Sequence, residues 1–263
     1  MKHYETHFNE YIKSSIDNPL HSVKILENIN NNFIELNNFI VYGPPGVGKY
    51  TQTLMLLKRF SQSELKYEKK IVITYNKNLY YFKISDIHYE IDMSLLGCNG
   101  KILWHEIYNK IVDIISSKNN KIGVIICKNF HEIHSELLEN FYSYMQILYQ
   151  SGIIIKFILI TEHISFLPDN ILNYCQHVNI TRPSRNKYNK CFKTNYSKTN
   201  NISLITNIKD IKNMKIVKNK LNMYEILCDK IINKIIDMNN IKYINLREII
   251  YDLCIYDLNI NIK

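Results

Sequence analysis

The chain has 263 residues, of which 46% are hydrophobic and 22% charged, so it can bury a full core in one or two domains. No stretch has about 18 consecutive uncharged apolar residues and the N-terminus lacks signal-peptide character, so neither a transmembrane helix nor a signal peptide is predicted. The formal net charge of +9 fits a protein that works beside phosphates. The abundance of lysine, isoleucine and asparagine is also what an AT-rich genome produces, so the origin of the charge stays open.

Six cysteines are spread along the chain without a C-x-x-C pair, and most of them stand within apolar runs. This distribution predicts buried free thiols and an intracellular, reducing compartment. The cysteines are Cys98, Cys127, Cys175, Cys191, Cys228 and Cys254.

Residues 1–38 are predicted to be helical. Phe8, Tyr11 and Ile12 would share one face of a first helix, and a second apolar stripe starts at Leu20. The sequence Asp17-Asn-Pro19 is a helix-start signal between the two.

The next stretch reads F-I-V-Y-G-P-P-G-V-G-K-Y-T over residues 39–51, and residues 51–60 continue with helical spacing. A strand, the pattern G-x-x-x-x-G-K and a helix together form a phosphate-binding loop. Its glycines let successive backbone N–H groups face the phosphates, and the ammonium of Lys49 reaches the β and γ oxygens. The predicted nucleotide-binding residues are Gly43, Pro44, Pro45, Gly46, Val47, Gly48, Lys49, Tyr50 and Thr51.

One position departs from the loop motif. Tyr50 follows Lys49, where the motif has a Ser or Thr that holds Mg²⁺. Either the loop carries one extra residue and Thr51 holds the metal, or Mg²⁺ is held poorly. The sequence therefore predicts binding of ATP or ADP and leaves Mg²⁺ and hydrolysis open.

Beyond the loop, apolar runs of strand length alternate with amphipathic helical patterns. This alternation predicts the α/β class, with a parallel sheet flanked by helices on both faces. Trp104 is expected in the core rather than at a ligand. The expected elements are a β-hairpin (69–75 and 80–84), strands at 88–93, 123–127, 156–161 and 177–180, and helices at 101–117, 135–149 and 167–174.

The character of the chain changes after Arg182. Ser, Thr, Asn, Lys and Arg dominate as far as about residue 220, and two amphipathic helical patterns follow at 221–238 and 243–258. Three parts are therefore expected: a nucleotide-binding domain over 1–184, a reduced lid or basic linker over 185–220, and a helical segment over 221–263.

In this order, the elements resemble a AAA+ clamp-loader subunit, specifically a small subunit of replication factor C. G-K-Y-T at 48–51 is similar to the G-K-K-T loop of one such subunit. Residues 88–97 (H-Y-E-I-D-M-S-L-L-G) resemble the stretch after its hairpin, and residues 251–258 resemble the start of its helical collar. The resemblance covers most of 20–184 and, more weakly, 221–263.

That resemblance implies a AAA+ P-loop fold with a reduced lid and a partial collar. It implies a hetero-oligomer with other clamp-loader subunits, which would place a sliding clamp on primed double-stranded DNA without sequence preference. A membrane is not expected among the partners. The expected location is the nucleus or a cytoplasmic replication site.

Several positions that carry chemistry in the family are changed. The family has an Asp that holds Mg²⁺ and a Glu that activates water, and this chain has Lys128 and Asn129 there. The sensor position, usually Asn, is Glu162, whose carboxylate would repel a γ-phosphate. The family's Ser-Arg-Cys, with its arginine finger, is matched by residues 173–175 (N-Y-C), and the nearest cation is Arg182. The resemblance therefore implies a subunit with impaired hydrolysis.

Two alternatives stay open at the level of sequence. One is an active P-loop ATPase or nucleotide kinase that uses Thr51, Asp92 or Glu132 in unfamiliar geometry. The other is a former ATPase retained as a nucleotide-free scaffold. His131 and His134 lie three residues apart, but no third ligand is evident, so a metal site is not predicted there.

Overall fold

The computed structural model describes residues 7–17, 21, 32–75, 77–146 and 152–192, together with the single positions 229, 232, 233, 236 and 247. Two compact units are distinguished, Thr6–Thr194 and the remainder of the chain, and the described ranges all belong to the first. Apart from these single positions, the helices expected at 221–238 and 243–258 lie outside the described residues, as does most of the expected lid.

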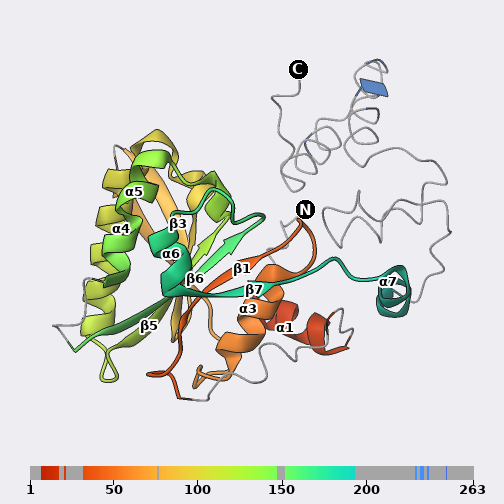
Figure 1. Cartoon of the computed structure of the whole chain (residues 1–263), viewed down its shortest axis with the longest axis horizontal. Helices are drawn as coiled ribbons and strands as arrows, with labels where there is room; N and C mark the ends of the chain where they lie inside the picture. The colour runs from red at the N-terminus through yellow and green to blue at the C-terminus, as the bar shows by residue number, and fades with distance from the viewer. Residues whose placement is uncertain are drawn as a thin grey trace. The chain divides into compact units, whose positions relative to one another are not determined.

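One seven-stranded sheet forms the centre of the first unit, in the order β2-β3-β4-β5-β6-β1-β7 (Figure 1). The five strands from β4 to β7 in this order are parallel, which confirms the predicted parallel sheet. The predicted hairpin, β2 and β3, is antiparallel and extends the same sheet beside β4. The strands are β1 (Asn38–Tyr42), β2 (Lys69–Tyr75), β3 (Asn78–Ile84), β4 (His88–Asp92), β5 (Ile122–Lys128), β6 (Ile154–Thr161) and β7 (Cys175–Asn179).

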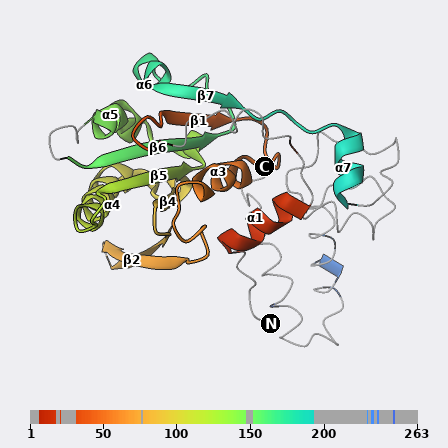
Figure 2. The same cartoon turned by 90° about the horizontal axis from the view of Figure 1, so that it is seen from below.

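Helices cover both faces of the sheet, as Figures 1 and 2 show. Helices α1 and α3 pack on one face and α4, α5 and α6 on the other. The described helices are α1 (Phe8–Asp17), α3 (Lys49–Lys58), α4 (Gly100–Ser116), α5 (Ser135–Gln146), α6 (Asp169–Tyr174) and α7 (Arg185–Phe192), with the short 3₁₀ helices η1 (Met93–Leu95), η2 (Gly97–Asn99) and η3 (Phe130–Glu132).

Alternation along the central strand β5 separates two apolar cores. Ile125 and Cys127 face α4 and α5, where Trp104 is fully buried as predicted. Val124 and Ile126 face the opposite side, toward α1 and α3. Because side chains alternate along a strand, Lys128 at the end of β5 also lies on the face covered by α3.

The predicted continuous helicity of residues 1–38 is wrong for the part just before β1. Residues 32–37 form turns, in which the Asn32 side chain accepts a hydrogen bond from the Ile34 N–H at 3.2 Å and Leu36 N–H donates to the Phe33 carbonyl. Such local side-chain bonds compete with helix formation. The first predicted helix corresponds to α1, and residues 22–31 lie outside the described part.

The cysteines differ from one another in exposure. Cys127 is buried and Cys175 partly so, and burial raises the pKa of both thiols, that of Cys175 to about 12. The prediction of burial is wrong for Cys98, which is exposed in η2. The side chains of Cys191, Cys228 and Cys254 lie outside the described part.

Within the described ranges, none of the helices combines the length and the apolar character needed to cross a bilayer.

Candidate functional site

The glycine-rich loop leaves β1 and enters α3 in a close fit against β7. A Cβ on Gly43 would stand 2.1 Å from the carbonyl oxygen of Ile180, whose own N–H donates to the Tyr42 carbonyl at 2.8 Å. Gly48 precedes the first helical residue with φ of 90°, in the left-handed region that favours glycine. The loop therefore needs glycine at both ends for structural reasons.

Lys49 is the first residue of α3 and turns back over the loop. Its Nζ donates to the carbonyl oxygens of Gly43 at 2.6 Å and of Pro44 at 2.9 Å. Burial lowers the pKa of Lys49, the Glu162 carboxylate acts to raise it, and the Arg182 guanidinium lowers it further. Two further charges, one of each sign, thus lie within electrostatic range of the loop lysine.

An open pocket of about 540 Å³ lies beside the first half of the loop. Gly43, Pro44 and Pro45 form one wall, and Glu162 and His163, directly after β6, form another. The structure therefore places the sensor-position residue Glu162 next to the loop.

The segment before β1 also contacts the loop. His21 Nε2 lies 2.8 Å from the carbonyl oxygen of Val47, so this nitrogen carries the proton and donates. Burial lowers the pKa of His21, the hydrogen bond to Val47 opposes this effect, and Lys187 adds to the lowering. Sequence reasoning did not identify this contact, because no motif marks a histidine at that position.

Tyr50 stands where the motif has Ser or Thr. Helix α3 begins at Lys49, so the loop contains no extra residue. The Tyr50 side chain extends to β4, where its hydroxyl donates to Glu90 Oε1 at 2.6 Å. In the described part of the chain, Thr51 makes no side-chain hydrogen bond, and its role as a Mg²⁺ ligand stays a prediction.

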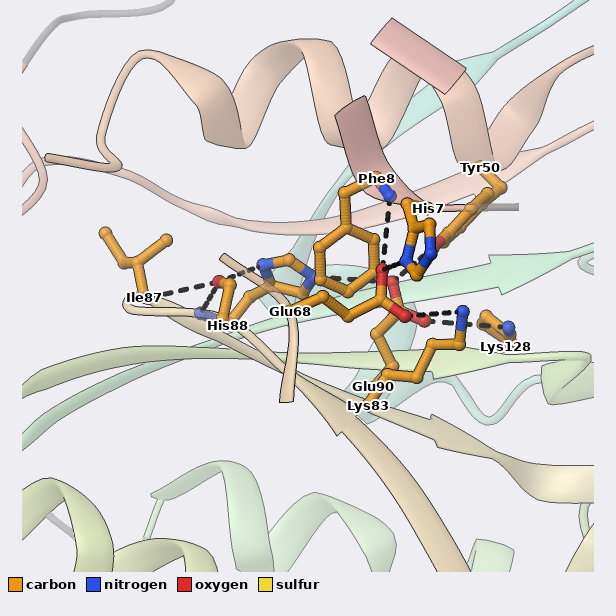
Figure 3. Close-up of polar contacts among 10 residues, drawn as sticks. His7, Phe8, Tyr50, Glu68, Lys83, Ile87, His88, Glu90 and Lys128 are labelled. Carbon is orange, nitrogen blue, oxygen red and sulfur yellow. Dashed lines mark hydrogen bonds and ion pairs between the residues drawn. The ribbon is translucent and has the colours of Figure 1, made fainter. Parts of the chain in front are cut away.

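Glu90 is the centre of a buried polar cluster under α3 (Figure 3). Besides the Tyr50 hydroxyl, its Oε1 accepts a hydrogen bond from His88 Nε2 at 3.3 Å. Its Oε2 lies 3.6 Å from the ammonium of Lys128, at the end of the neighbouring strand. The ammonium also lies 5.0 Å from the centre of the Tyr50 ring. We call Tyr50, Glu90 and Lys128 the Tyr–Glu–Lys cluster.

The protonation of His88 follows from the bonds of Ser85. Ser85 Oγ accepts from the N–H groups of Ile87 at 3.2 Å and His88 at 3.0 Å, so its hydrogen is left for His88 Nδ1 at 2.6 Å. Nε2 of His88 then carries the ring proton and donates to Glu90. Ser85, His88 and Glu90 are all buried. This chain of hydrogen bonds therefore positions Glu90, and the Ser85 hydroxyl is not exposed as a nucleophile.

The charge states of the cluster are set by opposing effects. Burial alone would raise the pKa of Glu90, but the hydrogen bond from His88, the charge of Lys128 and the hydrogen bond from Tyr50 outweigh it and hold this pKa below its ordinary value. Burial raises the pKa of Tyr50, and the neighbouring Glu90 charge raises it further. Glu90 is therefore a carboxylate at neutral pH, and Tyr50 is a neutral donor.

Phe8, the first residue of α1, lies beside His88 and Glu90, as Figure 3 shows. The Phe8 ring lies against the His88 ring, with centroids 4.8 Å apart. The Phe8 N–H donates to Glu68 Oε2 at 3.2 Å, and Glu68 Oε1 pairs with Lys83 Nζ at 2.8 Å. Glu68 thus links the start of α1 to Lys83 of β3, through one hydrogen bond and one ion pair.

Asn129, which stands where the family has the Glu that activates water, also contacts another side chain. Asn129 adopts the left-handed conformation (φ 49°), and its Nδ2 donates to both carboxylate oxygens of Asp92, at 3.0 and 3.2 Å. Asp92 also accepts from the Ser94 hydroxyl at 2.7 Å. Glu132 is exposed and lies 3.8 Å from His131 Nε2. Of the two carboxylates considered for an active ATPase, Asp92 therefore has other hydrogen-bond partners, whereas Glu132 is exposed to solvent beside His131.

The residues that match the family's arginine finger lie where α6 meets β7. Asn173 is exposed, and the Tyr174 ring packs against Tyr142 with centroids 5.5 Å apart. Arg182, after β7, acts on the pKa of Lys49 in the same chain. Its charge therefore lies within electrostatic range of this chain's own loop.

Among the described residues, no group of three or more His, Cys, Asp and Glu side chains is arranged to hold a metal ion. The His131 ring instead lies beside the ring of His163, with centroids 5.7 Å apart.

Solved structures of other proteins share part of this architecture at low similarity. RuvB from Thermotoga maritima, a Holliday junction branch migration motor, is 14% identical, covers 84% of this chain and 70% of its own, and has a TM-score of 0.38. A variant of the same protein covers 72% of this chain with a TM-score of 0.39, and PCH-2 from C. elegans is 12% identical, covers 82% and has a TM-score of 0.42. This chain spans only 52% and 54% of the lengths of the last two.

No protein-family model and no curated protein matches the chain. The fold class is clear from the chain itself: a phosphate-binding loop joins the parallel strand β1 to α3, and helices flank the sheet on both faces. The predicted α/β class is confirmed.

Proposed function

We propose that this chain is a nucleotide-binding AAA+ subunit related to the small subunits of clamp loaders, with little or no hydrolysis of its own. One contrast carries the proposal. The phosphate-binding loop has the expected backbone geometry, whereas the positions that would hold Mg²⁺ and activate water are occupied by Lys128 and Asn129, respectively, and both contact other side chains.

Nucleotide binding is supported by the loop between β1 and α3. Gly43 and Gly48 adopt backbone positions that only glycine fits well, and Lys49 lies over the loop mouth. A loop of this kind directs backbone N–H groups and a helix N-terminus toward an anion. ATP or ADP is the ligand class that this chemistry recognises.

Loss of hydrolysis is supported at the end of β5. Phosphoryl transfer requires a positioned water and stabilisation of the charge that develops on the phosphate. Asn129 cannot act as a general base, and its amide is committed to Asp92. Glu162 adds a negative charge near Lys49, where the transferred phosphate would lie.

Work in a clamp loader is the finer part of the proposal. Its support is the sequence similarity at 48–51 and 88–97, and at 251–258 outside the described residues. The proposed partners are other clamp-loader subunits, a sliding clamp and primed double-stranded DNA, at a replication site in the nucleus or the cytoplasm. If the full chain associates with none of these partners, this part of the proposal is lost.

Thermal unfolding with and without nucleotide tests the proposal. A ligand that binds only the folded state stabilises it by about 2.7 kcal/mol at one hundred times its Kd, so ATP or ADP should raise the melting temperature measurably. Lys49→Ala should abolish the rise. Lys110→Ala, at an exposed position of α4, is the matched control and should keep it. A melting temperature that no nucleotide changes would favour the nucleotide-free scaffold.

A further inference from the structure

We infer that this site takes its nucleoside di- or triphosphate without a divalent cation, with the ammonium of Lys128 standing where other P-loop proteins hold Mg²⁺. The inference rests on the proposed function and specifies the form of the ligand. It assigns Tyr50 and Lys128 as the residues that determine this specificity.

The two protein ligands of the usual metal site are both replaced, and the replacements contact each other. In P-loop NTPases, Mg²⁺ is held by the hydroxyl residue after the loop lysine and by an acid at the end of a neighbouring strand. Here those positions are Tyr50 and Lys128, and the Lys128 ammonium lies 5.0 Å from the centre of the Tyr50 ring. A cation is therefore already present between the helix and the strand.

Glu90 is a carboxylate close enough to the cluster to attract a metal, but its Oε1 already accepts two hydrogen bonds, and its Oε2, which has no hydrogen-bond partner among the described residues, faces the Lys128 ammonium. Oε1 accepts from Tyr50 and from His88, and Oε2 faces Lys128 at 3.6 Å. The charge of Glu90 is thus balanced by that of Lys128. A divalent ion placed here would meet an ammonium at close range, and the carboxylate in register with Lys128, Asp92, already accepts hydrogen bonds from Asn129 and Ser94.

The cluster also fixes Lys128 while leaving it accessible. Lys128 ends β5 and is in register with Asp92 of β4, so its Cα is held by the sheet. Its side chain is 32% exposed, whereas that of Glu90 is 3% exposed. The carboxylate thus holds the ammonium from the buried side, and in this proposal the exposed part of the side chain meets a phosphate oxygen.

Two further cations lie at the same loop. Lys49 lies over the loop, and the opposite charges of Glu162 and Arg182 both act on it. The three cations Lys49, Arg182 and Lys128 outnumber the two carboxylates Glu90 and Glu162 near the loop. Fixed cations that neutralise a polyphosphate do the electrostatic work that Mg²⁺ otherwise performs. The site therefore suits the metal-free nucleotide, which carries more negative charge than its Mg²⁺ complex.

Equilibrium binding of ATP and of ADP to the full chain, by calorimetry in EDTA and in excess Mg²⁺, tests the inference. Affinity in EDTA should equal or exceed affinity in Mg²⁺. Binding that is about tenfold or more tighter in Mg²⁺ would overturn the inference and leave nucleotide binding intact. Absence of binding in both buffers would overturn the proposed function and this inference with it.

Substitutions assign the effect to the cluster. Lys128→Met keeps the length of the side chain and removes its charge, so affinity in EDTA should fall about tenfold, the usual scale for one charge-assisted contact. Lys110→Met is the matched control and should change nothing. Unchanged affinity of Lys128→Met in EDTA, in a protein that melts cooperatively, would overturn the inference.

The double variant Tyr50→Thr, Lys128→Asp restores a hydroxyl and a carboxylate at the two metal-ligand positions. It should bind ATP more tightly in Mg²⁺ than in EDTA, reversing the preference of the natural chain. A folded double variant that still ignores Mg²⁺ would contradict the assignment of these two residues. If the double variant does not fold, Lys128→Met alone decides.

Discussion

Glu90 is the residue on which the most interactions of the candidate site converge. A buried carboxylate is costly unless its partners replace the lost water. Glu90 has a phenol, an imidazole and an ammonium around it, and each comes from a different position in the fold. Removing its charge therefore leaves Lys128 without its anion and two donors with a weaker acceptor.

This arrangement predicts unequal costs for two near-isosteric changes. Glu90→Gln should lower the free energy of unfolding by about 2–4 kcal/mol, because it removes the charge of an acceptor that takes two hydrogen bonds and that faces the partly exposed Lys128. Tyr50→Phe removes one hydrogen bond to a charged acceptor and should cost about 1.5–3 kcal/mol. Glu132→Gln, at an exposed carboxylate, is the control and should stay within about 0.5 kcal/mol. Urea unfolding at neutral pH measures all three.

The same comparison at low pH separates charge from packing. The folded-state pKa of Glu90 is lowered, so its contribution is complete above the unfolded value of about 4.3 and is lost as pH falls through the folded value. The stability difference between the natural chain and Glu90→Gln should therefore shrink below about pH 4. A difference independent of pH would mean that Glu90 acts through shape alone.

At this scale, the sequence predicted which residues form the loop but not what they contact. The G-x-x-x-x-G-K spacing is local, and it located Gly43 and Lys49. The bond from Tyr50 to Glu90 joins residues forty positions apart, so no local pattern contains it. One signal was present: the polar residues His88, Glu90 and Asp92 alternate with Tyr89 and Ile91 along β4 and must share one face.

Where β1 enters the loop, Gly43 packs against the backbone of Ile180, just after β7, with no space for a side chain. Gly43→Ala would bring a Cβ onto the backbone oxygen of Ile180, and backbone cannot rotate away as a side chain can. We expect a loss of about 1–3 kcal/mol of stability, together with loss of the nucleotide-dependent rise in melting temperature. The control is Gly100→Ala in α4, where the nearest atom would be 3.5 Å away and the cost should be small. Thermal melts with and without ATP report both effects.

Element types followed from period and composition, whereas their ends and neighbours did not. The apolar stripe of α4 and the alternation of β2 and β3 were sufficient to predict those elements. The turn at 32–37 was missed because its apolar residues occur at helical spacing while Asn32 bonds locally. The position of β1 between β6 and β7 depends on pairings far apart in the chain, which periodicity does not report.

At the scale of the whole molecule, the net charge of +9 is the property that relates to the proposed binding of DNA. If the charge serves DNA, affinity for primed double-stranded DNA should fall steeply with salt, with a log–log slope of about −0.9 for each phosphate neutralised. The affinity should not depend on base sequence, since backbone contacts carry no sequence information. Fluorescence anisotropy over a salt series, with scrambled primed duplexes as the control, measures both. Weak binding at all salt concentrations would identify the charge as compositional drift.

The N-terminal helix has a consequence for how the protein is cut into fragments. The Phe8 ring packs on His88, and the Phe8 N–H donates to Glu68, so α1 covers the buried carboxylate of Glu90. Yet α1 precedes the nucleotide-binding motif by about thirty residues. A fragment designed to start at β1 would open Glu90 and its partners to water. A fragment for expression should therefore begin before residue 7 and not at β1, next to the nucleotide-binding loop.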